Sequence, residues 1–149
     1  MAMTMSGEVQ LSALRQVVWT KLNDPEILKS CIPGCEDLVK SADNQFQATA
    51  KMKVGPVSAR FKGRVTLSDF DPPNSYRISG EGEGGVAGFA KGVATVTLLD
   101  KDDGTLLIYE VEAQIGGKLA QLGQRLISGS AKKLADEFFA NFAKAVQSN

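Results

Sequence analysis

The sequence predicts an α+β fold in which an antiparallel sheet curves around one long C-terminal helix. Residues 117–147 repeat apolar side chains at steps of three, four and seven or eight, which places them on one helical face. Much of the preceding chain alternates apolar with polar residues, the pattern of strands that bury one face. A sheet of this kind with its helices on one side is an α+β layout.

The N-terminal part of the chain is expected to form a strand and then two helices. Residues 3–11 alternate between apolar and polar, which predicts the first strand. Ser12 is the expected N-cap of a helix that runs to about Asn23. Asp24-Pro25 then starts a second helix, with the aspartate as cap and the proline at the first helical position. This short helix is expected to end by Cys31 because a Pro-Gly pair follows.

Six further strands are expected between these helices and the C-terminal helix, which makes seven in all. Turn-forming residues separate them at Asp43-Asn44, Gly55-Pro56, Asp71-Pro72-Pro73-Asn74 and Asp102-Asp103-Gly104. In residues 107–115, for example, apolar side chains occupy one face and glutamate or glutamine the other. One face of the sheet is therefore expected to contact the core and the other to contact water.

Composition excludes several classes of function. At 149 residues the chain fits a single domain, 1–149, and its 17 Lys and Arg balance 17 Asp and Glu, so nucleic acid is not expected as a partner. The absence of histidine excludes Ser-His-Asp and Cys-His catalysis and histidine-containing zinc sites. No apolar stretch is long enough to span a bilayer, and residues 1–7 lack the features of a secretion signal, so we expect a cytoplasmic protein. Its two cysteines would stay reduced there, and no metal site is expected.

Small residues alternate with aromatic ones on the expected inner face of the sheet, which predicts room for a ligand. The small ones are Ala48, Ala50, Ala59, Gly63 and Ala113. A glycine-rich run at 80–92 either bends the sheet or lets a ligand approach the backbone, and both interpretations remain open. The run is not a phosphate loop, since no Gly-Lys-Ser or Gly-Lys-Thr ends it. Apolar residues at helical spacing are also typical of an ordinary packed core.

Few residues offer acid–base chemistry. Glu81 and Glu83 are expected to face water if the alternation of their strand continues, although a glycine bulge would reverse it. Tyr109 is expected inside, where its hydroxyl either binds a carbonyl or quinone-like oxygen or only anchors the core. Cys31 and Cys35 lack further ligands for zinc, and a redox pair remains an alternative to two small buried apolar residues.

Seven short segments spread along the chain carry a resemblance to a known family. They are Asn23-Asp24-Pro25, Ile32-Pro33-Gly34-Cys35, Val54-Gly55-Pro56-Val57, Phe61-Lys62-Gly63, Asp71-Pro72-Pro73, Gly88-Phe89-Ala90-Lys91-Gly92 and Gly117-Lys118-Leu119-Ala120-Gln121-Leu122-Gly123. In this combination the sequence resembles the carbon monoxide dehydrogenase G-subunit family over nearly its whole length. That resemblance implies the helix-grip fold of the START-like (SRPBCC), polyketide-cyclase-like superfamily, a seven-stranded antiparallel sheet around a long C-terminal helix.

The resemblance also implies an accessory protein for a carbon monoxide dehydrogenase-type molybdenum hydroxylase. The associated roles are maturation, membrane recruitment or electron delivery to membrane quinone. Some members carry a C-terminal membrane anchor, whereas this sequence stops at Asn149. Any membrane contact is therefore expected to be peripheral, at the inner face of the membrane, or to be made through a bound lipid.

From these observations we expect a non-catalytic carrier that holds an isoprenoid quinone or lipid between sheet and helix, with no other cofactor. The expected walls of its cavity are Trp19, Phe61, Phe89, Tyr109, Leu119, Leu122, Leu126 and Phe138, and the expected mouth is Cys31, Ile32, Pro33 and Val86. Two alternatives remain. One is a cyclase- or dehydratase-like enzyme that acts on an apolar substrate with Tyr109 or Glu83 as acid or base, and the other is a ligand-free maturation adaptor.

Overall fold

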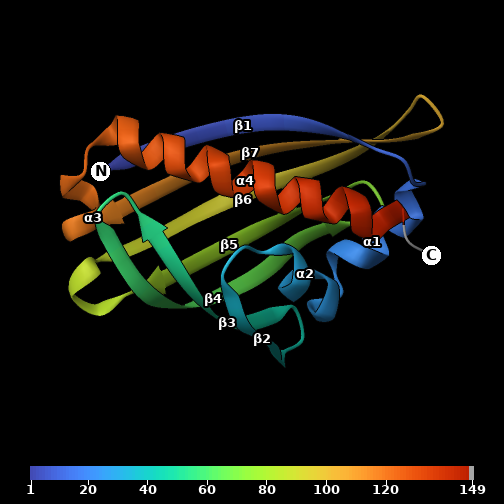
Figure 1. Cartoon of the computed structure of the whole chain (residues 1–149). Helices are drawn as coiled ribbons and strands as arrows, with labels where there is room; N and C mark the ends of the chain where they lie inside the picture. The colour runs from blue at the N-terminus through green and yellow to red at the C-terminus, as the bar shows by residue number, and fades with distance from the viewer. Residues whose placement is uncertain (148–149) are drawn as a thin grey trace.

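Seven antiparallel strands form one sheet in the computed structural model, which describes residues 1–147. The strand order is β1-β7-β6-β5-β4-β3-β2, and the long helix α4 lies along the inner face of the curved sheet (Figure 1). The strands are β1 (Ala2–Leu11), β2 (Cys35–Ala42), β3 (Gln45–Val54), β4 (Val57–Asp71), β5 (Ser75–Glu83), β6 (Phe89–Lys101) and β7 (Gly104–Gly116). The helices are α1 (Arg15–Leu22), α2 (Pro25–Cys31), the 3-10 turn η1 (Gly85–Ala87), α3 (Lys118–Gln121) and α4 (Gln124–Gln147). This layout confirms the predicted α+β, helix-grip fold with two short helices after the first strand.

Strand pairing decides which side chains face α4. Tyr109 of β7 pairs with Val96 of β6 and both are buried, whereas Glu110 and Glu112 are exposed on the other face. A shift of one residue in this register would bring the glutamates into the core, so the burial pattern holds the register in place. The predicted division of the sheet into a core-facing and a water-facing side is confirmed.

The two short helices begin differently. Asp24 caps α2 as predicted, because its carboxylate accepts a hydrogen bond from the backbone N–H of Glu26 at 3.0 Å. No side chain caps α1, so the predicted cap at Ser12 is wrong. The buried Thr105 of β7 donates a hydrogen bond to the Ala13 carbonyl at 2.7 Å. This bond holds residues 12–14 against the sheet, and the helix begins only after them.

The C-terminal helix is interrupted. The prediction of one helix over 117–147 is wrong, because Gly123 separates α3 from α4 with a φ of +90°. Glycine adopts this left-handed conformation without strain, and the apolar repeat continues on both sides of the break. Periodicity alone therefore does not reveal it. Within residues 1–147 no helix combines the length and hydropathy needed to cross a membrane.

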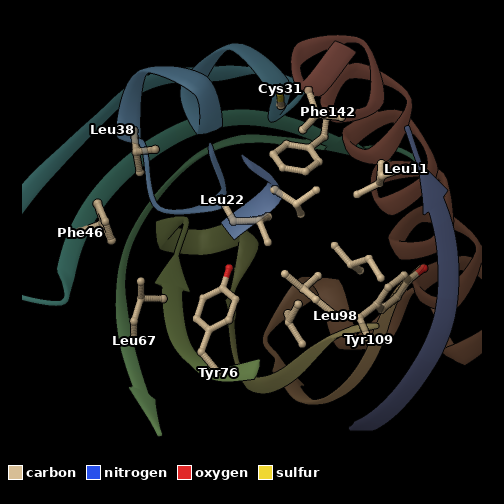
Figure 2. Close-up of a cluster of buried hydrophobic side chains, with 14 residues drawn as sticks. Leu11, Leu22, Cys31, Leu38, Phe46, Leu67, Tyr76, Leu98, Tyr109 and Phe142 are labelled. Carbon is tan, nitrogen blue, oxygen red and sulfur yellow. The ribbon is translucent and has the colours of Figure 1, made fainter. Parts of the chain in front are cut away.

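The core divides into two hydrophobic clusters along α4. The larger lies under the C-terminal half of the helix, where Phe142 is completely buried and points toward the inner face of the sheet (Figure 2). Stacked rings fill it: Phe138 lies 5.8 Å from Phe142 and Tyr109 lies 5.1 Å from Phe139, measured between ring centroids. The smaller cluster has Met3, Ile115, Leu119 and Ile127 as its buried members. The two ends of the helix are consequently packed to different degrees.

Candidate functional site

An apolar cavity of about 310 Å³ lies between the sheet and the N-terminal half of α4. It is bounded by α3, α4 and every strand except β2. The lining residues are Met3, Met52, Val54, Phe61, Gly82, Ala90, Ile115, Leu119, Ile127, Ser130, Ala131 and Leu134. Ser130 is the single member of this lining with a polar side chain, and none is ionisable. The cavity therefore offers dispersion and hydrophobic contact and almost no hydrogen bonding.

The empty space arises because facing elements present small residues at the same level. Ala131 and Ser130 on α4 lie across from Gly82 on β5 and Ala90 on β6, which pair with each other in the sheet. A Cβ atom added to Gly82 would come no closer than 3.5 Å to another atom, the Lys62 carbonyl oxygen. The strand could thus carry a side chain here, and glycine leaves the volume open.

Other glycines of the inner face are required by the sheet itself. A Cβ atom on Gly63 would lie 2.9 Å from the Glu81 carbonyl oxygen, and one on Gly92 would lie 2.6 Å from that of Glu112. Both separations are shorter than real Cβ contacts, so these positions exclude a side chain. Within the glycine-rich run, Gly92 is therefore required by the close approach of neighbouring strands, as Gly63 is on β4, whereas Gly82 leaves space that a ligand could occupy.

Two short segments, η1 and α3, lie beside one end of the cavity, and α3 contributes Leu119 to its lining. η1 and α3 meet backbone to backbone where Gly88, at φ +113°, lies against Gly116 and Gly117. Leu119 of α3 is buried and reaches the cavity, whereas Val86 at the tip of η1 is 84% exposed. The β3–β4 turn completes this end, with Gly55 at positive φ, as tight hairpins require.

The predicted wall residues separate into three groups. Phe61 and Leu119 line the cavity, and Leu122 packs in the same cluster. Trp19, Tyr109 and Phe138 belong to the larger, filled cluster. Phe89 and Leu126 are 47% and 38% exposed and do not line the cavity. Met52, Ile115, Ile127 and Leu134 also line the cavity. The periods of their strands and helix point them inward but do not distinguish the cavity end of the sheet from the packed end.

The residues predicted to form the mouth do not line the cavity. Cys31 is buried in the larger cluster, and its carbonyl accepts a hydrogen bond from the Asn141 side chain at 3.0 Å, which ties α2 to α4. Ile32 and Pro33 follow α2 and, like Cys31, are not part of the cavity lining. Val86 lies on η1, which is next to α3 but contributes no residue to the cavity lining.

The side chains considered for acid–base chemistry do not line the cavity. The Tyr109 hydroxyl lies against Gly7 of β1, where an added Cβ atom would be 2.5 Å away. Glu81 and Glu83 are exposed on the outer face, as the alternation predicts. Burial raises the pKa of the Cys31 thiol and of the Cys35 thiol, so both stay protonated at neutral pH. Within residues 1–147 no three acidic or cysteine side chains are grouped so that they could hold a metal ion.

Two larger hollows, of about 580 and 510 Å³, lie on the outer face of the sheet. They share Arg64, Glu81 and Lys91, which pair side by side on neighbouring strands. Charged and polar side chains contribute to the walls of both hollows, so water fills them at little cost. We place the candidate site in the smaller cavity because its lining is apolar and lies inside the fold.

Comparison with known proteins shows which protein family and which solved structures this chain resembles. The family model for the G subunit of carbon monoxide dehydrogenase (CoxG) matches residues 7–147. No curated protein sequence matches the chain. A conserved protein from Geobacillus kaustophilus has a similar solved structure, with a TM-score of 0.92 and 32% sequence identity, covering 97% of this chain and 95% of that one.

More distant solved structures share the fold. The Zhui aromatase/cyclase from Streptomyces sp. R1128 has a TM-score of 0.72 at 11% identity, covering 99% of this chain and 94% of that chain. Ara h 8.0201 has a TM-score of 0.69 at 14% identity, covering 100% of both chains. At these identities the likeness concerns the fold alone.

Proposed function

The chain belongs to the CoxG family, that of the carbon monoxide dehydrogenase G subunit, and from this membership we propose that it binds the apolar part of a hydrophobic ligand in the cavity beneath α4. The observation that carries the proposal is the cavity itself, which combines about 310 Å³ of space with an almost wholly apolar lining. Apolar cavities of this kind stay dry when empty and take up apolar molecules of matching size.

The size of the cavity sets the size of the bound group. At about 30 Å³ for each water-sized group, it holds roughly ten carbon atoms. Burial of a methylene group contributes about 0.8 kcal/mol, so ten of them contribute about 8 kcal/mol, equivalent to a Kd of about 1 μM. The entropy lost on association offsets part of this gain. About 8 kcal/mol is therefore an upper bound on the binding free energy of the tail alone, and its Kd lies above about 1 μM.

The lining also indicates how the ligand would be oriented. A polar head group inside the cavity would find the Ser130 hydroxyl and few other partners, and its desolvation would be costly. The tail therefore enters the cavity and the head stays near its rim. An isoprenoid quinone or a lipid has this combination of a long apolar tail and a small polar head.

Membership of the CoxG family supports a role for such a carrier beside a carbon monoxide dehydrogenase. We propose that it serves as a non-catalytic accessory of a carbon monoxide dehydrogenase-type molybdenum hydroxylase and links that enzyme to the membrane or its quinone pool. The cavity lining supplies no acid or base for the enzymatic alternative.

Native mass spectrometry of the purified protein, followed by organic extraction, tests ligand binding directly. The matched variants are Ala131→Phe, which fills the cavity from α4, and Ala140→Phe, which adds the same ring to the exposed side of that helix. We expect the wild type and the Ala140→Phe variant to bind a quinone with a ten-carbon tail, and Ala131→Phe to lose at least about tenfold in affinity. Equal binding by the two variants would exclude the cavity as the site.

A further inference from the structure

The first strand leaves one of its two backbone edges without a partner. β1 is an outer strand of the sheet and pairs only with β7 (Figure 1). The Ile115 N–H donates to the Met1 carbonyl at 2.7 Å, so the backbone of Met1 faces β7. Hydrogen-bonded positions alternate along an antiparallel ladder, so the other odd-numbered residues of β1 face β7 as well. The N–H and C=O groups that point away from β7 belong to Ala2, Thr4, Ser6, Glu8 and Gln10.

These outward groups lie in contact with water. No backbone group of another segment within residues 1–147 bonds to them, and all five side chains are exposed. Buried backbone groups are nearly always hydrogen-bonded, so groups without a partner lie where water reaches them. β1 therefore presents a row of unused donors and acceptors along its edge.

The other outer strand is protected against pairing. The register of β2 against β3 shifts twice, and its exposed side chains include Glu36, Asp37 and Lys40. Bulges and charges of this kind keep an edge strand from pairing with another chain. The register of β1 against β7 is continuous over its ten residues, and Glu8 is the one charged residue of β1. This difference favours β1 as the edge to which a further strand can be added.

The outer face beside this edge is acidic. Glu112 and Glu110 of β7 lie opposite Thr4 and Ser6, and Glu8 lies on β1 itself. All three carboxylates are exposed, and neither β1 nor β7 contains a lysine or an arginine. Toward the β2 side of the sheet, β3 and β4 carry the exposed cations Lys51, Lys53, Arg60, Lys62 and Arg64. A strand added at β1 therefore meets local negative charge, although the chain as a whole is neutral.

We propose that an extended basic segment of a partner protein binds along β1 as an eighth strand of the sheet. Its backbone pairs with the outward groups of Thr4, Ser6 and Glu8, and its lysine or arginine side chains lie on the outer face beside the three carboxylates. Backbone hydrogen bonds supply the affinity in this mode of recognition, and alternate side chains supply the selectivity.

Two further observations define this surface. A second copy of the chain is a poorer occupant, because pairing of two β1 strands would bring two sets of these carboxylates together. The surface is also separate from the apolar cavity. β1 contributes only Met3 to the cavity lining, and that side chain is buried on the inner face. The inference therefore goes beyond the proposed function.

A capped seven-residue peptide that alternates lysine with threonine and valine is the probe, and the same peptide with glutamate in place of lysine is its control. Fluorescence anisotropy of each labelled peptide with the full chain measures the affinity. We expect the glutamate peptide to bind at least about tenfold more weakly than the lysine peptide. Amide hydrogen exchange should slow at Thr4, Ser6 and Glu8 when the lysine peptide binds, while Met5 and Gly7, which already face β7, should change little.

A pair of variants at one position tests the backbone pairing. Ser6→Pro removes an outward N–H and should weaken binding of the lysine peptide at least about tenfold, whereas Ser6→Ala keeps that N–H and should bind as the wild type does. Because the Ser6 N–H points away from β7, thermal unfolding of Ser6→Pro should remain close to that of the wild type.

A second pair of variants tests the charge. Glu8→Gln/Glu112→Gln should weaken binding about threefold for each carboxylate removed, or roughly tenfold in all. Glu81→Gln/Glu83→Gln removes two exposed carboxylates from β5 on the same face and should change binding much less. This pair leaves the backbone of β1 intact, so it tests the proposal even if the proline variant is less stable.

Equal affinity for the lysine and glutamate peptides, or equal binding by the two variants of either pair, would overturn the proposal. Slowed exchange on other strands with none on β1 would overturn it too, because the peptide would then bind elsewhere. Light scattering without peptide reports self-association. Dimers that form in the wild type and are lost in Ser6→Pro would show that a second copy occupies this edge, and would refute the basic segment.

Discussion

Replacing Gly82 with alanine places one methyl group at the edge of the apolar cavity, and replacing Gly92 with alanine places the same group against the backbone of β7. Both glycines lie on the inner face of neighbouring strands, β5 and β6. At Gly82 the nearest atom to the new Cβ is 3.5 Å away, an ordinary contact. At Gly92 the Glu112 carbonyl oxygen is 2.6 Å away, and the backbone has to move.

The two substitutions should therefore change the free energy of unfolding in opposite directions. Alanine in place of a strand glycine stabilises by about 0.5–1 kcal/mol, and burial of a methyl group adds about 0.8 kcal/mol. We expect Gly82→Ala to gain about 1–2 kcal/mol. The crowding at Gly92 is expected to cost about 1–3 kcal/mol, the usual range for an overpacked site.

Urea titration of both variants measures the difference, and thermal unfolding should show a shift of about 2–4 °C for each kcal/mol. Gly82→Val, which fills more of the cavity, should in addition weaken binding of the ten-carbon quinone. Gly82→Ala and Gly92→Ala of equal stability would refute the assignment of open space to one glycine and forced approach to the other.

Further predictions concern the helix break, a buried hydrogen bond and a thiol. Gly123→Ala should lower the free energy of unfolding by about 1–2 kcal/mol, because residue 123 has a φ of +90°. Gly129→Ala, inside α4 with open space around it, should raise the free energy of unfolding by about 1 kcal/mol. A urea titration that ranks the two variants the other way would contradict the helix break. Thr105→Val leaves the Ala13 carbonyl without its hydrogen-bond donor and should lower the free energy of unfolding by about 1–3 kcal/mol. An unchanged value in the same urea titration would show that the bond contributes nothing to stability. Burial raises the pKa of the Cys31 thiol above its unfolded value, so the stability that this thiol contributes is present below the ordinary thiol pKa and declines as pH rises through and above it. The free energies of unfolding of the wild type and of Cys31→Ala should therefore converge as pH rises over this range. A constant difference between them would contradict the assignment.

The alternation of the sequence by itself determined the strands and their faces. Glu81 and Glu83 are exposed as the period of two predicts, and the same period places Phe61 inward. Local chemistry also determined the start of α2, since Asp24 needs only the N–H groups of the next turn to act as a cap. These predictions succeed because they depend on neighbours within a few positions in the chain.

Tertiary structure decided where along α4 the space lies. Leu119 and Phe138 belong to the same apolar repeat of the sequence, yet the first lines the cavity from α3 and the second stacks on Phe142 in α4. Periodicity specifies the face of a helix and says nothing about the size of the residues opposite, which here come from six strands distant in sequence. The break at Gly123 is likewise set by the turn that brings α3 over the cavity, because a glycine between two apolar repeats fits a continuous helix and an interrupted one equally well.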